Sequence, residues 1–462
     1  DPVAMDNLGA YTAVVTCFEY LCGQGEGAAL APALATKWTP AAGGKEWTFE
    51  LRKGVTWHDG KPFTSADVVA TLDRLSGSNL KAYIVEGASV AVDDFTVKVT
   101  LNNPDGGFPY NVSWSNPQSV ITPKDYVKGT TLDQKPNGTG AFKLEKYDVA
   151  LGATFVRNDN WWGGKPYLDK LEYIFSDDIA TQITGLQGNA ADAIVQFSVA
   201  GGDALLNDPN IEVISLVGSA HREIWMNTRE GNFADVRVRQ AVALGLDRPG
   251  LIGTVLKGKG EIGNDHPIAP VYEFWDSSQP QRTRDVAKAK GLLDAAGKAG
   301  LKITLYAPKL QEIPQLAELV QSQLKDIGMD ITLDVQSTST FYNEWCETYD
   351  PICDGGQEFG IVDYGNRGAP DVYLVKSYAT GEWNSAHYNS DPFKAAVKEY
   401  QAALDTTGRA SATKKIQAIA TEDVPYAIPY FYNLLSAHSK KVTGIVITGL
   451  GHYDCSKAGF VA

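Results

Sequence analysis

Apolar and polar residues alternate in two different rhythms between residues 47 and 75. At residues 47–52 every second position is apolar, and this period of two predicts a strand with one buried face. Asp59-Gly60 then forms a turn, and apolar positions return at helical spacing after Thr64 and Ser65, two residue types that cap helices. The apolar positions are Trp47, Phe49 and Leu51 in the strand, and Val68, Leu72 and Leu75 in the helix. No nucleophile, base or metal-ligand set lies in this stretch, so we interpret it as scaffold.

The same two rhythms continue along the rest of the chain. Helical spacing predicts helices at residues 5–22, 179–186, 236–246, 284–298, 312–327, 371–378, 391–405 and 409–421. Alternation predicts a strand at residues 95–101, and we predict further strands at residues 142–147, 171–175, 193–197, 222–227, 301–306, 331–335 and 359–364. Because strands and helices interleave, we predict an α/β fold with mixed sheets covered by helices, including a βαβ-like unit at residues 171–197.

Composition limits the classes of function. With 462 residues, the chain is too long for one ordinary hydrophobic core, which favours more than one domain. A formal net charge of −14 argues against binding to nucleic acid or to an anionic membrane surface, since both rely on clustered basic residues. No apolar run is long enough to span a bilayer.

The five cysteines match no zinc-binding pattern. Cys346 and Cys353 flank a short turn-forming stretch, and we predict a disulfide between them. A second hypothesis is a bridge from Cys455 to Cys17 or Cys22. Disulfides would indicate an oxidising compartment outside the cytoplasm.

Catalytic and cofactor motifs are weak. Residues 258–263 read G-x-G-x-x-G, but they follow a predicted helix and precede a turn, whereas a dinucleotide site needs a strand before the glycines and a helix after them. The six histidines are scattered and show no metal-binding spacing. We therefore expect no catalytic residues, no metal and no cofactor, and a protein that is not an enzyme.

Three long stretches carry a family resemblance. Residues 51–68 read LRKGVTWHDGKPFTSADV, residues 158–169 read NDNWWGGKPYLD, and residues 227–248 read NTREGNFADVRVRQAVALGLDR. Their patterns and order resemble the extracellular solute-binding proteins of family 5, the peptide-binding receptors of ABC importers. The resemblance implies a two-lobed periplasmic-binding-protein type II (Venus flytrap) fold with an extra subdomain in the first lobe.

The resemblance also implies domain limits. We expect the core of lobe I to consist of residues 1–25, 145–232 and 434–462, its subdomain of residues 26–144, and lobe II of residues 233–433. A first hinge is expected at residues 228–235, where Gly231 and Asn232 favour flexibility.

Two segments match ligand-contacting segments of that family. Cys22, Gly23 and Gln24 match a loop beside the cleft, and Ile361, Val362, Asp363 and Tyr364 match a segment whose aspartate pairs with the ligand's α-ammonium group. Asp363 is at the position of that aspartate. The alternative is that Asp363 pairs with a neighbouring arginine such as Arg367.

Aromatic residues on matching segments add further candidates. Trp225, Trp345 and Trp383 could stack on a ligand or pack in the core, and core packing is favoured for each one singly. Asn384 lies in a run similar to a family segment that approaches the ligand. These residues complete the predicted site.

The expected function is capture of an oligopeptide-like solute between two lobes and its delivery to the transmembrane subunits of an ABC permease. An oligosaccharide or a metal chelate is the alternative ligand, and an extracytoplasmic hydrolase is the alternative of another class. We expect a monomer at the periplasmic or extracellular face of the cell membrane that touches the membrane only through the permease or a lipid anchor, with no nucleic acid partner.

Overall fold

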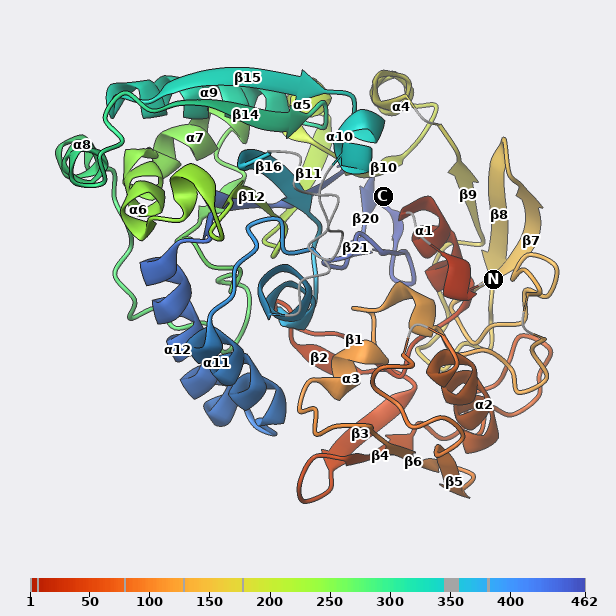
Figure 1. Cartoon of the computed structure of the whole chain (residues 1–462). Coiled ribbons are helices and arrows are strands. Elements are labelled where there is room, and N and C mark those ends of the chain that lie inside the picture. The colour runs from red at the N-terminus through yellow and green to blue at the C-terminus, as the bar shows by residue number, and fades with distance from the viewer. Residues whose placement is uncertain are drawn as a thin grey trace. The chain divides into compact units, whose positions relative to one another are not determined.

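The structure is a computed structural model that describes residues 2–5, 8–78, 80–127, 129–176, 178–344, 357–379 and 383–461. The chain divides into two compact units. Unit 1 contains Asp1–Phe197, Ala204–Leu216 and Leu435–Ala462, and unit 2 contains Ser198–Asp203 and Val217–Leu434. Each unit holds its own sheets and helices (Figure 1).

Unit 1 is built mainly from short strands with few helices. Its helical elements are η1 (Pro2–Ala4), α1 (Leu8–Cys17), α2 (Ser65–Ser76), α3 (Phe108–Asn111), η2 (Pro117–Ser119), α4 (Ile179–Gln187) and η3 (Asp203–Leu205). Its strands are β1 (Cys22–Gln24), β2 (Leu30–Pro32), β3 (Ala35–Pro40), β4 (Glu46–Leu51), β5 (Val90–Asp93), β6 (Thr96–Thr100), β7 (Phe142–Asp148), β8 (Gly152–Arg157), β9 (Lys170–Ile174), β10 (Ala193–Phe197), β11 (Ile211–Leu216), β19 (Leu434–Ser439), β20 (Val442–Thr443), β21 (Val446–Ile447), β22 (Tyr453–Asp454) and β23 (Gly459–Phe460).

The strand–turn–helix stretch predicted from residues 47–75 is confirmed. Strand β4 lies in the antiparallel sheet β3-β4-β6-β5, and Trp47 and Phe49 are buried on one of its faces. Helix α2 begins after Thr64, which forms a capping box with Asp67, and it lies beside this sheet (Figure 1). His58 Nε2 contacts the Gly140 carbonyl oxygen at 3.1 Å, so it ties the turn to a second turn of unit 1. These contacts agree with the interpretation as scaffold.

Two predictions in unit 1 were wrong. The helix expected at residues 5–22 is only α1, because the Gly140 N–H donates to the Cys17 carbonyl oxygen and the chain then continues into β1. The expected βαβ unit does not form. Strand β9 pairs with β8, whereas β10 pairs antiparallel with β19, so the strands on either side of α4 lie in different sheets.

Unit 2 combines one large sheet with most of the long helices. Its helical elements are α5 (Val199–Gly202), η4 (Gly231–Phe233), α6 (Val236–Gly245), α7 (Arg248–Val255), α8 (Val286–Ala295), α9 (Ile313–Asp326), α10 (Thr338–Glu344), η6 (Tyr373–Ala379, a π-helix), α11 (Asp391–Ala402) and α12 (Thr406–Asp423). Its strands are β12 (His221–Met226), β13 (Gly260–Ile262), β14 (Lys302–Pro308), β15 (Asp330–Gln336), β16 (Phe359–Tyr364), β17 (Tyr426–Ala427) and β18 (Tyr430–Tyr432).

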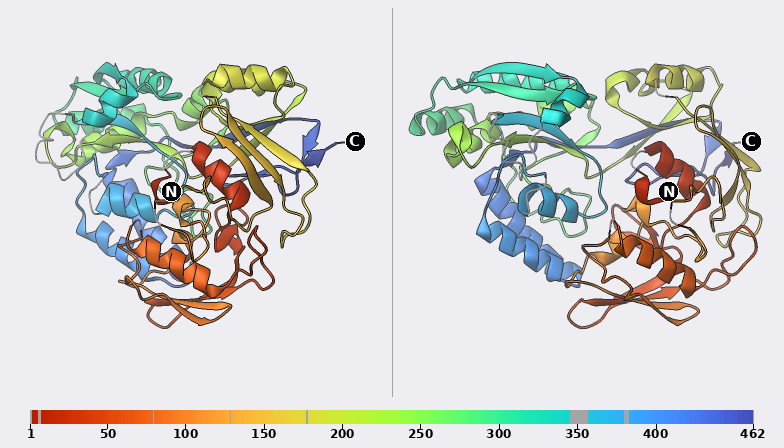
Figure 2. Two further views of the ribbon diagram at one scale, coloured as in Figure 1. Left: turned by 90° about the vertical axis from the view of Figure 1, so that its right-hand side faces the viewer. Right: turned by 45° about the vertical axis from the view of Figure 1, so that its right-hand side comes forward.

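The sheet of unit 2 has seven strands in the order β13-β18-β12-β16-β14-β15, with β17 also paired to β12. It is mixed, because β14 is parallel to both β15 and β16 whereas β12 is antiparallel to β16. Helix α9 packs along β14 and β15 (Figure 1), as its apolar stripe of Leu316, Val320 and Leu324 requires. Helices α11 and α12 lie side by side (Figure 2).

The unit boundary differs from the expected lobe boundary. We expected residues 217–232 in the first lobe, but the chain enters unit 2 at Val217 and β12 pairs with β16 inside the large sheet. The expected hinge at residues 228–235 also lies within unit 2, where the Thr228 N–H donates to the Ala386 carbonyl oxygen. Residues 426–432 form β17 and β18 of unit 2.

Candidate functional site

The adjacent strands β12 and β16 place charged and aromatic side chains on opposite faces of the unit 2 sheet. Residues in a strand alternate between faces, and the register pairs Arg222 with Asp363 and His221 with Tyr364. The face that carries Arg222 and Asp363 continues into the apolar core and is called the core face. The opposite face, which carries His221 and Tyr364, is called the aromatic face. Core-face residues in the apolar core are Ile224, Met226, Phe359 and Ile361.

Arg222 is the centre of a buried polar network on the core face. Its side chain is 0% exposed and makes two hydrogen bonds to Glu312, from Nε to Oε1 at 2.9 Å and from Nη2 to Oε2 at 3.0 Å. Nη2 also donates to Gln311 Oε1 at 2.7 Å, and Nη1 donates to Asp363 Oδ1. The guanidinium lies 4.3 Å from the ring centre of Tyr432. Burial opposes the charge of Arg222, but Tyr432 and Glu312 hold its pKa above the ordinary value.

Two tyrosines donate hydrogen bonds to the carboxylates of this network. Tyr430 OH donates to Glu312 Oε1 at 3.0 Å, and Tyr432 OH donates to Asp363 Oδ1 at 3.0 Å. Burial raises the pKa of Tyr432 to about 12, so its hydroxyl stays protonated and remains a donor at neutral pH. The network is therefore fixed from several elements: β12, the turn before α9, β16 and β18.

The network holds one cation and two carboxylates, so its formal charge is negative when Glu312 and Asp363 are both ionised. Asp363 is the accessible member, with a side chain that is 25% exposed against 4% for Glu312. Both contacts of Asp363 use Oδ1, and within the part of the chain that the structure describes Oδ2 has no hydrogen-bond partner. Asp363 thus presents a free carboxylate oxygen beside an uncompensated negative charge.

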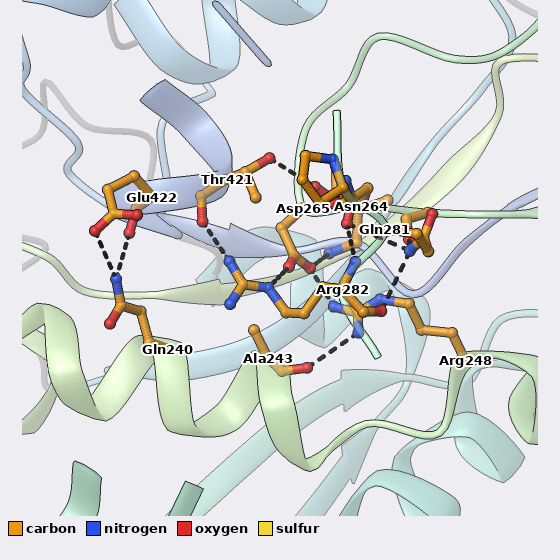
Figure 3. Close-up of polar contacts among 12 residues, drawn as sticks. Gln240, Ala243, Arg248, Asn264, Asp265, Gln281, Arg282, Thr421 and Glu422 are labelled. Carbon is orange, nitrogen blue, oxygen red and sulfur yellow. Dashed lines mark hydrogen bonds and ion pairs between the residues drawn. The ribbon is translucent and has the colours of Figure 1, made fainter. Parts of the chain in front are cut away.

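Asp265, also in unit 2, is a carboxylate whose two oxygens both have partners within the protein (Figure 3). It is 0% exposed and is paired with two arginines, with Arg248 Nη2 at 2.6 Å from Oδ1 and Arg282 Nε at 2.7 Å from Oδ2. The Ile428 N–H donates to Oδ1 at 3.1 Å. Asp265 therefore has both oxygens occupied and an excess of positive charge around it. It follows directly after residues 258–263, so that glycine-rich stretch leads into a structural ion cluster.

Arg367, the arginine named as the alternative partner of Asp363, was the wrong residue. Arg367 Nη1 donates to the Asn366 carbonyl oxygen at 2.8 Å, whereas the arginine that contacts Asp363 is Arg222. Arg222 lies 141 residues earlier in the chain and directly opposite Asp363 in the sheet. A carboxylate with an internal arginine partner is therefore present, but it is only partly satisfied.

The aromatic face holds the other residues of the predicted β16 segment. Tyr364 is buried and stacks on His221, with ring centroids 5.5 Å apart, and its OH donates to the Trp383 carbonyl oxygen at 3.2 Å. Val362 is also on this face and is buried, while Ile361 is buried on the core face. The predicted segment is therefore divided, because Asp363 and Tyr364 point to opposite sides of the sheet.

Trp225 and Glu223 are enclosed on the aromatic face. Trp225 is 2% exposed, and its ring covers Gly360, where an added Cβ would lie 2.7 Å from the indole. His221 Nε2 lies 3.2 Å from Glu223 Oε1, and burial raises the pKa of Glu223. The burial of Trp225 agrees with core packing, the alternative favoured for it.

Trp383 and Asn384 lie at the rim of the aromatic face. Trp383 is partly exposed, and Lys376 Nζ lies 4.6 Å from its ring centre. Asn384 is buried, and its amide bonds to the Tyr388 backbone, with Nδ2 2.7 Å from the carbonyl oxygen and Oδ1 2.8 Å from the N–H. Asn384 therefore shapes a loop, and Trp383 is the more accessible of the two.

The predicted residues of unit 1 form strand β1. Cys22 is fully buried, and its carbonyl oxygen accepts from the Trp114 N–H. Gly23 pairs with Ala31 of β2. Gln24 Nε2 donates to the Gly27 carbonyl oxygen at 2.5 Å, and Gln24 Oε1 accepts from the Gly449 N–H at 2.7 Å. These contacts hold the 25–29 loop in place.

The cysteine hypotheses have different outcomes. Cys17, Cys22 and Cys455 are buried free thiols, so the hypothesis of a bridge from Cys455 to Cys17 or Cys22 was wrong. Burial raises the pKa of Cys17 and of Cys455 to about 12 each, which keeps both as unreactive thiols. Trp345 and the predicted pair Cys346–Cys353 lie outside the described residues.

Other searched features add no chemistry to the site. Over the described ranges, no three His, Cys, Asp or Glu side chains gather as a metal-ion site would require. A pocket of about 250 Å³ lies in unit 1 against α2 and is lined by none of the predicted site residues. None of the helices in the described part of the chain is long and apolar enough to cross a membrane.

Sequence reasoning missed the partners of Asp363. The signal available for Arg222 was a run of three ionisable residues, His221 to Glu223, at the start of a strand that then continues Ile-Trp-Met. No comparable signal marks Gln311 or Glu312, because their role depends on where the turn between β14 and α9 lies in the folded unit.

Comparisons with known proteins agree on one family. The model of the bacterial extracellular solute-binding proteins, family 5 (middle), matches residues 29–386. The dipeptide-binding protein of Escherichia coli is 27% identical over 462 residues, covering 91% of this chain and 84% of that protein. Heme-binding protein A of Haemophilus influenzae is 27% identical over 459 residues, covering 91% and 82%. The solved structure of HbpA2 from Haemophilus parasuis has a TM-score of 0.87 at 22% identity and covers 100% of this chain and 97% of that one. That similarity confirms the expected α/β periplasmic-binding-protein fold.

Proposed function

This chain belongs to the bacterial extracellular solute-binding proteins of family 5, and from that premise we propose that it captures an oligopeptide-like solute and delivers it to the transmembrane subunits of an ABC permease. The proposal includes a monomer that acts at the periplasmic or outer face of the cell membrane. It binds its solute and releases it chemically unchanged. The dipeptide-binding relative supports a peptide, and the heme-binding relative keeps other solutes as competing ligands.

The observation that carries the peptide proposal is the state of Asp363. Its Oδ2 atom has no hydrogen-bond partner among the described residues, its side chain is partly exposed, and the network behind it has more carboxylates than cations. A ligand ammonium group would restore the charge balance and would supply the missing donor. A hydrogen bond between charged groups contributes about 1.5–3 kcal/mol, which is enough to orient a peptide by its amino terminus.

The arrangement around Asp363 also favours a cation over an anion. Among the described residues, Arg222 is the one guanidinium in the network, and it is fully buried behind its partners, so an anionic group would meet the carboxylate first. Because Asp265 is closed by two arginines, it offers no comparable opening.

Native mass spectrometry of the purified protein, followed by calorimetry, tests this function. We expect a co-purified species with a peptide mass, and binding of short peptides with a free amino terminus. N-acetylated peptides of the same sequence should bind more weakly, because they lack the ammonium group. A co-purified sugar or metal chelate, with no binding of any free-amine peptide, would overturn the peptide assignment. Conversion of the ligand into a product would overturn the receptor assignment in favour of a hydrolase.

A further inference from the structure

Gln311 is an exposed residue that contacts a fully buried arginine. Its Oε1 atom accepts from Arg222 Nη2 at 2.7 Å, although the Gln311 side chain lies at the surface and the Arg222 side chain is 0% exposed. The two ends of its amide therefore face different environments. Oε1 points inward to the guanidinium, and no residue in the described part of the chain bonds to Nε2.

The backbone of Gln311 is strained. Its φ angle is +47°, in the left-handed region that non-glycine residues rarely adopt. Gln311 lies in the turn between β14 and α9, and the next residue, Glu312, makes the bidentate contact with Arg222. Glycine would fit this backbone at lower cost, so a glutamine here points to a use for its side chain.

Gln311 and Asp363 are held side by side by the same guanidinium. Arg222 donates to Asp363 from Nη1 and to Gln311 from Nη2, which are neighbouring nitrogen atoms of one planar group. Each of the two residues keeps one polar atom without a partner in the described part of the chain. Asp363 offers the acceptor Oδ2, and Gln311 offers the donor Nε2. The pair thus presents a negatively charged hydrogen-bond acceptor next to a neutral N–H donor.

The chemistry of this pair matches the first residue of a peptide, which carries an ammonium group and a carbonyl oxygen on adjacent carbons. We propose that Gln311 contacts the ligand directly and donates from Nε2 to the carbonyl oxygen of the residue whose ammonium binds Asp363. Gln311 then determines specificity, because it distinguishes an amino-terminal peptide from a simple amine. This inference rests on the proposed function and names one more residue of the same site.

The test compares two ligands and four proteins by calorimetry. One ligand is L-alanyl-L-alanine, and the other is its (E)-alkene isostere, which keeps the ammonium and the shape but lacks the first carbonyl and the adjoining N–H. We expect the wild-type protein to bind the peptide at least about three- to tenfold more tightly than the isostere, which includes the effect of one neutral hydrogen bond to the carbonyl. In Gln311→Met this ratio should fall by about three- to tenfold. Gln315→Met, a change at an exposed glutamine of α9, should keep the wild-type ratio.

The variant Gln311→Glu distinguishes a direct contact of Gln311 with the ligand from an indirect effect through its hydrogen bond to Arg222. A glutamate keeps an oxygen acceptor for Arg222 Nη2 but has no N–H donor, so the preference for the peptide should fall as in Gln311→Met although the network is retained. If Gln311→Glu or Gln311→Met keeps the wild-type ratio, the proposal is wrong. If wild-type protein binds neither ligand, the proposed peptide function has failed, and the failure is then not specific to Gln311.

Gln311→Gly serves as a second variant with its own readout. Glycine relieves the positive φ angle, so the melting temperature should be equal to or above that of the wild type while the preference for the peptide falls as in Gln311→Met. A Gly variant that is stable and keeps the wild-type ratio would overturn the proposal.

Discussion

Arg222 and Asp363 are register partners across the β12–β16 strand pair, and the guanidinium of one donates to the carboxylate of the other. Two nitrogen atoms of the same guanidinium, Nε and Nη2, donate to Glu312, so Asp363 receives only Nη1. This unequal sharing leaves Asp363 both fixed in position and open on one side.

Asp363→Asn should weaken binding of a free-amine peptide by about tenfold or more, because the amide removes the negative charge that pairs with the ammonium. Asparagine keeps an oxygen for Arg222 and Tyr432, so the melting temperature should change little. Isothermal titration with a free-amine peptide and its N-acetylated form measures the effect. Equal losses for both ligands, or unchanged affinity for the free amine, would remove Asp363 from the ammonium site.

Arg222→Met should lower the free energy of unfolding by about 3–5 kcal/mol, since it leaves Glu312 buried without its ion-pair partner. Urea denaturation measures the loss. Lys37→Met is the matched control, because Lys37 pairs with Glu50 at the surface, where the side chains are 65% and 52% exposed. Its effect should stay within about 0.5 kcal/mol.

Restoring charge balance should recover part of that loss. The double variant Arg222→Met with Glu312→Gln removes both members of the buried pair, so it should be more stable than Arg222→Met alone. A double variant no more stable than the single one would show that the loss arises from packing of the arginine side chain and not from the uncompensated carboxylate.

Glu19 should make the stability of unit 1 depend on pH. Burial raises its pKa from 4.5 to about 7, although the indole N–H groups of Trp162 and Trp161 favour the ionised form. Folding therefore favours the protonated acid. The contribution of Glu19 is fully present below pH 4.5 and is lost as the pH rises through about 7, with a total on the order of 3 kcal/mol.

Glu19→Gln tests this dependence, because it removes the titrating group. Urea denaturation across this pH range should show wild-type stability falling relative to the variant as pH rises. Tryptophan fluorescence of the folded wild-type protein should titrate over the same range, since Trp161 and Trp162 contact the carboxyl group. A difference between the two proteins that is constant with pH would contradict the raised pKa.

The thiols of Cys17, Cys22 and Cys455 should be inert in the folded protein and should react with a disulfide reagent after denaturation. Burial raises the pKa of each of them, so little thiolate forms at mildly alkaline pH. If the predicted Cys346–Cys353 disulfide is present, two further thiols appear only after reduction. Reaction of all five cysteines in denatured, unreduced protein would rule that disulfide out.

Local patterns predicted the bounds of two elements of unit 2 well. The strand at residues 359–364 was predicted with the bounds that β16 has, and the helix at residues 312–327 differs from α9 by one residue at each end. Apolar positions at helical spacing indicate the buried side of α9, whereas β16 is a short, mostly apolar run that is buried on both faces. The predicted helix at residues 5–22 was too long because its end depends on a contact with Gly140, which no local pattern reveals.

The site could be predicted only in part. Resemblance indicated Asp363, but its partner is determined by strand register between positions 141 residues apart. Arg367 was considered because it is near in sequence, whereas sheet pairing brings Arg222 closer in space. The roles of Gln311 and Glu312 depend on the turn between β14 and α9, and neither residue type signals a buried contact by itself.

The alternation along β16 has a consequence for how such receptors change ligands. Asp363 and Tyr364 are consecutive residues that occupy opposite faces of one sheet. Deletion of one residue ahead of them within this strand would exchange their faces, so that the phenol of Tyr364 would replace the carboxylate opposite Arg222. The loss of a single codon would thereby put an aromatic residue at the position proposed to bind the ligand ammonium, while the residues ahead of the deletion kept their faces. Diversification of solute range in such a lineage could then proceed by strand slippage as well as by substitution.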